Sequence, residues 1–393
     1  MKRKFSILLV GAVIIGAIFS LVGVALVSQA KSEPMARKIV VFKSGALNEF
    51  DRDALVKKFG GVKVKDLKLI EGRAVLLSPQ AEKDLARQED VLRIDDDVEV
   101  FALENPFRTA KNVFTQAQVL PWGVDRIDAE KVWATTTGDP VKVAVIDTGI
   151  DLSHPDLKAN IKGGYNAINP RKSANDDNGH GTHVAGTVAA LDNGIGVIGV
   201  GPKIDLYAVK VLNRNGSGYL SDVIEGLDWA IANKMQVINM SLGTASDIQS
   251  LHDAVIAAKN AGIVQVAAAG NNYGGAVDYP AAYDEVIAVS GTNASDTIAY
   301  FSSVGPQVDL AAPGVSIYST YKGQTYKTLS GTSMAAPHVT GVAALVIDAK
   351  KCGGCTPFEV QQRLEETAED LGDSGKDKFY GSGLVDAEAA VVR

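Results

Sequence analysis

Short apolar runs alternate with amphipathic stretches from about Pro121 to the end of the chain, and this alternation limits the fold more than any other feature. The runs that can form strands are 141–149, 204–212, 236–243, 263–270 and 285–292. Helix candidates, among them 220–234 and 247–262, lie between them. Because strands that are apolar throughout bury both of their faces, the pattern predicts an α/β fold in which helices cover both faces of a central, mostly parallel sheet.

A smaller unit with a different order of predicted strands and helices precedes this region, from about Lys38 to Leu103. Hydrophobic periodicity divides it into a strand, a helix, two strands, a second helix capped by Ser78, and a final strand over 91–103. The order β-α-β-β-α-β predicts a small ferredoxin-like α+β domain. The unit contains no His or Cys, so we expect it to serve packing or binding rather than catalysis.

The first thirty residues have the features of a targeting segment. A basic start, MKRK, is followed by a long apolar run and by small residues at 28–30 that suit a signal peptidase. We therefore expect an extracellular protein; an uncleaved anchor on the outer face of the membrane is the alternative, because the apolar run is nearly long enough to span a bilayer. The expected divisions are a signal peptide at 1–30, the N-terminal domain at 31–105, a linker at 106–117 and the main domain at 118–393.

Charge and cysteine content narrow the functional classes. The net charge of −7 argues against a nucleic-acid-binding protein, which would normally present a basic face. Cys352 and Cys355 are too few for a zinc site, and no neighbouring His or Cys completes one. In an exported chain they favour a short disulfide that clamps a helix–helix turn; a redox-active pair is the alternative.

Three polar residues stand out beside the predicted strands and helices. Asp147 ends the run VAVID, at the carboxyl edge of a sheet where functional groups gather; a metal ligand, an N-cap and a member of a catalytic triad are all open interpretations. His180 lies between two glycines at the start of a predicted helix, and His183 follows three residues later. This pair lacks both the intervening acid and the third ligand of a typical zinc site, so metal binding is the weaker interpretation.

Ser333 follows a Gly-Thr turn and begins a long apolar helix. A helix N-terminus favours negative charge, so Ser333 is either an N-cap or a nucleophile whose attack on a carbonyl creates an oxyanion there. Asn271 follows the run VAAAG and is either a turn residue or an amide donor to that oxyanion. In chain order, Asp147, His180 and Ser333 match one known arrangement of the Ser-His-Asp triad.

Several long motifs in this order carry a family resemblance. The segments VAVIDTGIDLSHPDL, NGHGTHVAGT, INMSLG, VAAAGN and GTSMAAPHVTG resemble those of the subtilisin-like serine proteases, the subtilases of peptidase family S8. The resemblance spans Pro121 to Arg393, and the unit at 38–103 is similar to the family's inhibitory and chaperone-like propeptide, of the inhibitor I9 type. It implies a three-layer subtilisin-like fold and a secreted serine endopeptidase (EC 3.4.21) of broad specificity, made as a self-processing proenzyme. A catalytically inactive subtilase-like binding module is the alternative.

The resemblance also implies a role for each of these residues. Ser333 would be the nucleophile, His180 the base, and Asp147 the group that orients His180 and stabilises its charged form. Asn271 and the backbone N–H of Ser333 would form the oxyanion hole. His183 would be structural, and a histidine base implies a neutral-to-alkaline optimum.

Substrate binding is implied by a further local match. Subtilases hold a peptide as an additional strand between two exposed backbone segments. The matching residues here are Gly216, Ser217, Gly218, Ser241, Leu242 and Gly243. The short loop after Asn271 places Asp278 near the closed end of the first specificity pocket, so we expect this pocket to tolerate Lys or Arg beside large apolar residues. A solvated loop acid is the alternative.

Structural calcium is implied by the segment AALDNGIGVIGVGP, which resembles the loop of the family's tight calcium site. The implied ligands, all of them oxygens as Ca²⁺ requires, are Gln118, Asp156, Leu191, Asn193, Ile195 and Val197. The expected partners are protein or peptide substrates and the chain's own propeptide, and we expect a monomer. Self-cleavage is expected between Glu104 and Ala117, so that Gln118 stays in the mature enzyme.

Overall fold

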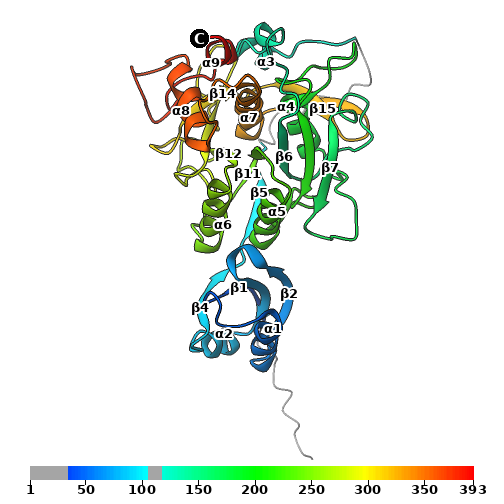
Figure 1. Ribbon diagram of the computed structural model, residues 1–393. Coiled ribbons are helices and arrows are strands. Elements are labelled where there is room, and N and C mark those ends of the chain that lie inside the picture. The colour runs from blue at the N-terminus through cyan, green and yellow to red at the C-terminus, as the bar shows by residue number, and fades with distance from the viewer. Residues whose placement is uncertain (1–33, 105–116) are drawn as a thin grey trace, which may run out of the picture. The chain divides into compact units, whose positions relative to one another are not determined.

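The computed structural model describes residues 34–104 and 117–393, and the described residues from Met35 onward cluster as one unit (Figure 1). The predicted signal peptide at 1–30 and nearly all of the predicted linker at 106–117 lie outside the described residues. None of the described helices is both long and apolar enough to cross a membrane.

The N-terminal domain has the predicted ferredoxin-like order. Its elements are β1 (Ala36–Phe42), α1 (Glu49–Lys58), β2 (Val62–Leu67), a 3₁₀ turn (Lys68–Ile70), β3 (Gly72–Leu77), α2 (Pro79–Leu85) and β4 (Val91–Asp96). The strands form an antiparallel sheet in the order β2-β3-β1-β4. Ser78 caps α2 as predicted, since its hydroxyl accepts a hydrogen bond from the Ala81 N–H at 3.2 Å. Val40, Phe42 and Leu85 belong to a core cluster of this domain.

The single strand expected over 91–103 is wrong, because the segment is divided. β4 ends at Asp96, and a separate strand, β5 (Glu99–Ala102), begins three residues later. Between them, the buried Asp97 turns its carboxylate to Ser221, from which it accepts two hydrogen bonds. β5 then pairs with strands of the main domain instead of the N-terminal sheet.

The main domain is built on a seven-stranded sheet in which every neighbouring pair is parallel. In the order β14-β13-β12-β10-β6-β8-β7, its strands are Leu310–Pro313, Ile287–Thr292, Val264–Ala268, Val237–Met240, Lys142–Asp147, Asp205–Lys210 and Ile161–Asn166. Each of the five predicted apolar runs supplies one of these strands. The two edge strands were not predicted; β7, with the sequence IKGGYN, lacks an apolar run because much of it is exposed.

Helices cover both faces of the sheet, which confirms the three-layer α/β prediction (Figure 1). Along β6, Val143 and Val145 pack in the cluster that includes α4 (His180–Ala189) and α7 (Thr332–Asp348). The alternate residues Ala144 and Ile146 pack in the cluster that includes α5 (Leu220–Ala232) and α6 (Gln249–Asn260). Successive side chains of a strand point to opposite faces, so one apolar run anchors both helical layers.

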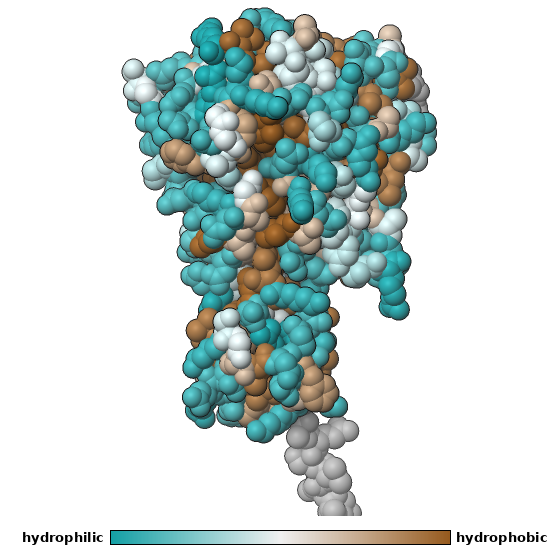
Figure 2. Space-filling view, in the orientation of Figure 1, coloured by the Kyte–Doolittle hydropathy of each residue, from teal (hydrophilic) through white to brown (hydrophobic). Residues whose placement is uncertain are grey.

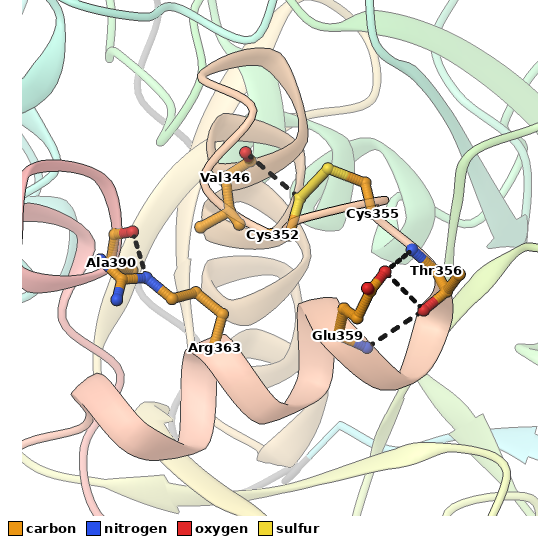
Figure 3. Close-up of a disulfide and its surroundings, with 7 residues drawn as sticks. All are labelled: Val346, Cys352, Cys355, Thr356, Glu359, Arg363 and Ala390. Atoms are coloured by element: carbon orange, nitrogen blue, oxygen red, sulfur yellow. Dashed lines mark hydrogen bonds between the residues drawn. A yellow bond between two sulfur atoms is a disulfide. The ribbon is translucent and has the colours of Figure 1, made fainter.

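The remaining elements of the main domain lie outside its seven-stranded sheet. They are α3 (Trp122–Arg126), a 3₁₀ turn (Glu130–Val132), β9 (Ser217–Tyr219), β11 (Leu242–Gly243), β15 (Ile317–Tyr321), β16 (Thr325–Leu329), α8 (Pro357–Thr367) and α9 (Ala387–Val392). The predicted disulfide joins Cys352 to Cys355 in the turn between α7 and α8 (Figure 3). Directly after it, Thr356 and Glu359 form a reciprocal capping box at the start of α8 (Figure 3).

Candidate active site

Asp147 and His180 meet at the carboxyl edge of the sheet. Asp147 is the last residue of β6, and His180 is the first residue of α4. His180 Nδ1 lies 2.8 and 2.9 Å from the two carboxylate oxygens of Asp147, and both residues are buried. Because a carboxylate can only accept, Nδ1 carries the proton and Nε2 is left as the basic nitrogen. Burial lowers the pKa of His180, but the Asp147 carboxylate raises it by more, so the pKa stands above its ordinary value of 6.5.

His183 has a different environment one turn along α4. Its Nε2 lies 3.0 Å from the carbonyl oxygens of both Ile317 and Lys327, to which it donates. Burial, together with the nearby His180, lowers the pKa of His183 to about 3. A ring that stays neutral and binds two carbonyl groups joins α4 to the β15–β16 hairpin.

Ser333 lies in the first turn of α7, at its N-terminus. Its hydroxyl donates to the carbonyl oxygen of Ser241 at 2.9 Å. Among the described residues, His180 Nε2 has no hydrogen-bond partner. The Ser333–His180 hydrogen bond of a working triad is therefore not formed in this structure, because the serine proton points to Ser241 instead.

Asn271 follows β12, and its side-chain amide contacts both Thr332 and Leu103. Its Oδ1 accepts hydrogen bonds from the backbone N–H of Thr332 at 3.0 Å and from the Thr332 hydroxyl at 3.1 Å. These contacts fix the orientation of the amide, so that Nδ2 must point the other way. There it donates to the carbonyl oxygen of Leu103 at 2.7 Å.

The two predicted substrate-binding segments flank a strand of the same chain. β5 lies between β9 and β11 in a three-stranded sheet, and both pairings are antiparallel. The predicted binding residues lie in β9, in β11 or directly before them: Gly216, Ser217, Gly218, Ser241, Leu242 and Gly243. Figure 2 shows hydrophobic residues gathered along the middle of the visible face, in the region of β5, between hydrophilic flanks.

Asp278 is buried beside this sheet. A Cβ added at Gly243 would lie 3.0 Å from the Asp278 Cβ and 3.1 Å from Leu103 Cδ1, so both side chains border Gly243. The Asp278 carboxylate accepts a hydrogen bond from Asn272 Nδ2 at 2.9 Å and is 7% exposed. Burial raises its pKa. This environment differs from the solvated loop acid that was the alternative.

The loop after α4 brings the implied calcium ligands together. Gln118 Oε1 accepts from the N–H of Gly194 at 2.6 Å, and Gln118 Nε2 donates to the Leu191 carbonyl at 3.1 Å. Asn193 Oδ1 accepts from the Ile195 N–H at 3.1 Å. These bonds hold Gln118 against the loop at 191–197, called the cation loop below, without an ion.

Asp156 provides the one carboxylate of this set. Its Oδ2 accepts from the Val197 N–H at 3.0 Å, whereas its buried Oδ1 makes no hydrogen bond of regular geometry with the described residues, although the side chains of Tyr326 and Asn193 interact with the carboxylate. Burial raises its pKa to about 6. A buried carboxylate oxygen without a regular hydrogen bond, beside a carbonyl-rich loop, fits a hard cation such as Ca²⁺. Within the described ranges, no group of three or more His, Cys, Asp or Glu side chains could hold a metal.

Sequence reasoning missed the residues that hold the site in place. Thr332 orients Asn271, and Leu103 presents its carbonyl to that amide. The signal for Leu103 was its position as the last apolar residue before the polar stretch that begins at Glu104. No local pattern marked Thr332, because its partner lies sixty-one positions away.

Comparison with known proteins agrees with the geometry. The model of the subtilase family matches residues 138–383. The thermostable alkaline protease of Halalkalibacterium halodurans is 50% identical over 277 residues, which are 70% of this chain and 74% of that protein. Subtilisin DY of Bacillus licheniformis is 50% identical over 279 residues, 70% of this chain and 99% of its own. The minor extracellular protease Epr of Bacillus subtilis is 39% identical over 377 residues, 94% of this chain and 57% of that protein.

Proposed function

The chain belongs to the subtilase family, is a serine endopeptidase acting on peptide substrates, and, we propose, performs this reaction with Ser333, His180 and Asp147. The observation that carries the proposal is the buried Asp147–His180 pair beside a serine at a helix N-terminus. No observation favours an inactive binding module.

Each of the three residues has a distinct part in the reaction. Ser333 Oγ attacks the scissile carbonyl while His180 Nε2 takes its proton, and Asp147 stabilises the imidazolium that forms. The raised pKa of His180 suits this role, because the site must stabilise the imidazolium that forms when the ring takes the proton. Before attack, the Ser333 hydroxyl has to turn from Ser241 to His180; such hydrogen bonds are commonly loose or differently aligned until substrate is positioned.

We propose that Asn271 and the backbone N–H of Ser333 form the oxyanion hole. The Asn271 amide already donates to a peptide carbonyl, that of Leu103, which supports this role. Its orientation is fixed by Thr332, so the donor costs little reorganisation when negative charge develops.

We propose that substrates bind as β5 does, as a strand between β9 and β11. Main-chain pairing reads no side chains and therefore gives broad specificity. Selectivity would come from the first specificity pocket, where we propose that the buried Asp278, whose Cβ borders Gly243, favours Lys or Arg beside apolar residues.

We propose that the N-terminal domain is an inhibitory and folding-assisting propeptide. Its C-terminal strand, β5, fills the substrate-binding sheet. Lys65 pairs with Asp222 and, at 2.7 Å, with Glu225 of α5, while Arg93 pairs with Asp253 of α6 at 2.5 Å. Parallel sheets with many non-local contacts fold slowly, and a docked domain that fixes two helices against the sheet would lower that barrier.

We further propose that structural Ca²⁺ binds the cation loop. The residues that would hold it are Gln118, Asp156, Leu191, Asn193, Ile195 and Val197. When bound, the ion would neutralise the buried Asp156 charge and order the surrounding carbonyl groups. We also propose export through the segment at 1–30, which is consistent with an extracellular relative.

Active-site labelling tests the catalytic proposal. A fluorophosphonate probe is expected to label Ser333, and casein is expected to be digested. Ser333→Ala should abolish labelling and lower turnover by on the order of a million-fold, the loss found for a subtilisin serine. Asn271→Ala should lower turnover by about 10²–10³-fold, the range found for this kind of donor in a subtilisin. Labelling of another residue would contradict the assignment.

A further inference from the structure

The end of β5 is held in register with both strands of the substrate-binding sheet. The Ala102 N–H donates to the Gly216 carbonyl at 2.9 Å, and the Leu103 N–H donates to the Ser241 carbonyl at 3.3 Å. The chain is therefore fixed on both sides up to Leu103, the last residue for which these strand contacts are made.

Among the described residues, the proposed oxyanion donor meets the carbonyl of Leu103. Asn271 Nδ2 donates to it at 2.7 Å. In the register of β5, Ala102 lies opposite Leu242 and Leu103 follows it, so this donor polarises the carbonyl carbon of the residue directly after the strand.

The nucleophile lies at the same peptide group. Ser241 O accepts both the Leu103 N–H and the Ser333 hydroxyl. Because the two donors lie 2.9 Å and 3.3 Å from one oxygen, the Ser333 oxygen is at most 6.2 Å, the sum of these distances, from the Leu103 nitrogen. The Leu103 side chain borders Gly243, one of the residues proposed above to bind substrate.

Glu104, the next residue, lies on the side of the catalytic base. Its carboxylate interacts electrostatically with His180 and helps to raise the pKa of the ring. The nitrogen that would leave on cleavage belongs to Glu104, the residue whose carboxylate acts on the His180 ring.

From this geometry, and resting on the proposed function, we propose that the chain cuts itself between Leu103 and Glu104. Ser333 Oγ bonds to the Leu103 carbonyl carbon and its proton passes to His180. The Leu103–Glu104 C–N bond then breaks, and His180 returns the proton to the Glu104 nitrogen. A solvent water hydrolyses the Leu103 ester, which leaves a carboxylate on Leu103 and restores Ser333. The sequence predicts a cut between Glu104 and Ala117; the Leu103–Glu104 bond lies one bond upstream of that interval.

The test is a time course of the full-length precursor at high dilution, followed by intact mass and N-terminal sequencing. The first new N-terminus is expected to read Glu-Asn-Pro-Phe, and the rate should not depend on concentration. A first product beginning at Thr109 or Asn112, after Arg108 or Lys111, would overturn the inference, as would any other first cut within 105–117.

Matched variants make the outcome specific. Glu104→Pro should abolish the cut at this bond, because a tertiary amide cannot be positioned as the secondary amide is, whereas Phe107→Pro should be processed at the wild-type rate. The inference fails if Glu104→Pro is processed normally. Fluorophosphonate labelling of Ser333 in the same samples separates the two proposals: labelled enzyme cut elsewhere, or chain left uncut, contradicts the bond assignment, while cut chain that stays unlabelled at Ser333 contradicts the proposed function itself.

Discussion

Asp97 accepts two hydrogen bonds from Ser221, one from its backbone N–H at 2.8 Å and one from its hydroxyl at 2.9 Å. Ser221 is the second residue of α5, so a carboxylate of the N-terminal domain caps a helix of the main domain. Asp95 does the same for Ser250, near the start of α6, through both the N–H and the hydroxyl. Two acids on one stretch of chain thus satisfy the ends of both helices on this face of the sheet.

Removing one of these caps should release the N-terminal domain sooner. A lost N-cap costs about 0.5–2 kcal/mol, so Asp97→Ala should shorten the lag before activity appears by roughly 2- to 30-fold. Ser221→Ala, which leaves the Arg37–Asp97 ion pair in place, should act in the same direction by less. The lag is measured with a chromogenic peptide after dilution of the precursor. Glu89→Ala, an exposed change on the same domain, is the control, and a lag in Asp97→Ala equal to this control would contradict the capping role.

The pH dependence of self-cleavage should depend on Glu104. Burial lowers the pKa of His180, but Asp147 and then Glu104 raise it above 6.5. Since the base must be neutral, self-cleavage is lost as the pH falls through this raised value. Glu104→Gln removes one negative charge and should move the midpoint of the profile to lower pH. The rate of precursor loss between about pH 5 and 9 measures this. Glu99→Gln, an exposed change on β5, should leave the midpoint in place; coincident profiles for all three proteins would exclude the Glu104 effect.

Calcium should stabilise the enzyme above about pH 6 and lose its effect below. The pKa of Asp156 is raised by burial from 3.8 to about 6. Without a cation, the folded state therefore loses stability as the pH rises through about 6 and this buried group ionises, and a bound cation offsets the loss only where the carboxylate is charged. EGTA should lower the Tm of the Ser333→Ala protein at pH 8 and have little effect at pH 5. Asp156→Asn should remove the difference, and Asp192→Asn, exposed in the same loop, should keep it. A Tm that EGTA leaves unchanged at pH 8 would rule out the site.

Asp278 should favour a basic residue before the scissile bond, and more so at higher pH. Burial raises the pKa of Asp278, so the attractive charge develops only as the pH rises through that raised value. The ratio of kcat/KM for P1-lysine over P1-phenylalanine peptides should be higher in the wild type than in Asp278→Gly, and should climb with pH only in the wild type. Asp284→Gly, a change in a neighbouring exposed acid, is the control. Equal ratios in the wild type and Asp278→Gly would show that the buried acid does not select substrates.

The disulfide should contribute modestly to stability. Cys352 and Cys355 close a loop of four residues before α8 (Figure 3), and the chain-entropy relation gives about 2 kcal/mol for so short a loop. Cys352→Ser/Cys355→Ser in the Ser333→Ala background should lower the unfolding midpoint in guanidinium chloride. Reductant should lower the midpoint of the parent to the same value and leave the double variant unchanged. An unaffected parent would show that the bridge does not stabilise the fold.

The sequence predicts the sheet and the approach of Asp147 to His180 for a physical reason. An apolar run can be recognised locally, and parallel strands bring their carboxyl ends to one edge whatever their order. The division of 91–103 into β4 and β5 follows no such local rule. Three consecutive acids, Asp95 to Asp97, interrupt the alternation, but the group that holds the chain at this break, Ser221, is 124 positions away.

The state of Ser333 was equally beyond the sequence. Its place at the start of a helix follows from the turn before it, but the direction of its hydroxyl is a choice between staggered rotamers. In this structure Ser241 accepts the proton, a contact that no spacing pattern encodes. The sequence therefore identifies Ser333 as a candidate, but only the folded site shows which group its hydroxyl donates to.

In the uncut chain, the two ends of the stretch from Glu104 to Ala117 are held at once. Leu103 rests on Asn271, while Gln118 is bonded to the loop at Gly194. Gln118, downstream of the proposed cut, is thus already bonded to the cation loop before hydrolysis. After the proposed cut, the N-terminal domain still has to leave before β9 and β11 are free to pair with a substrate.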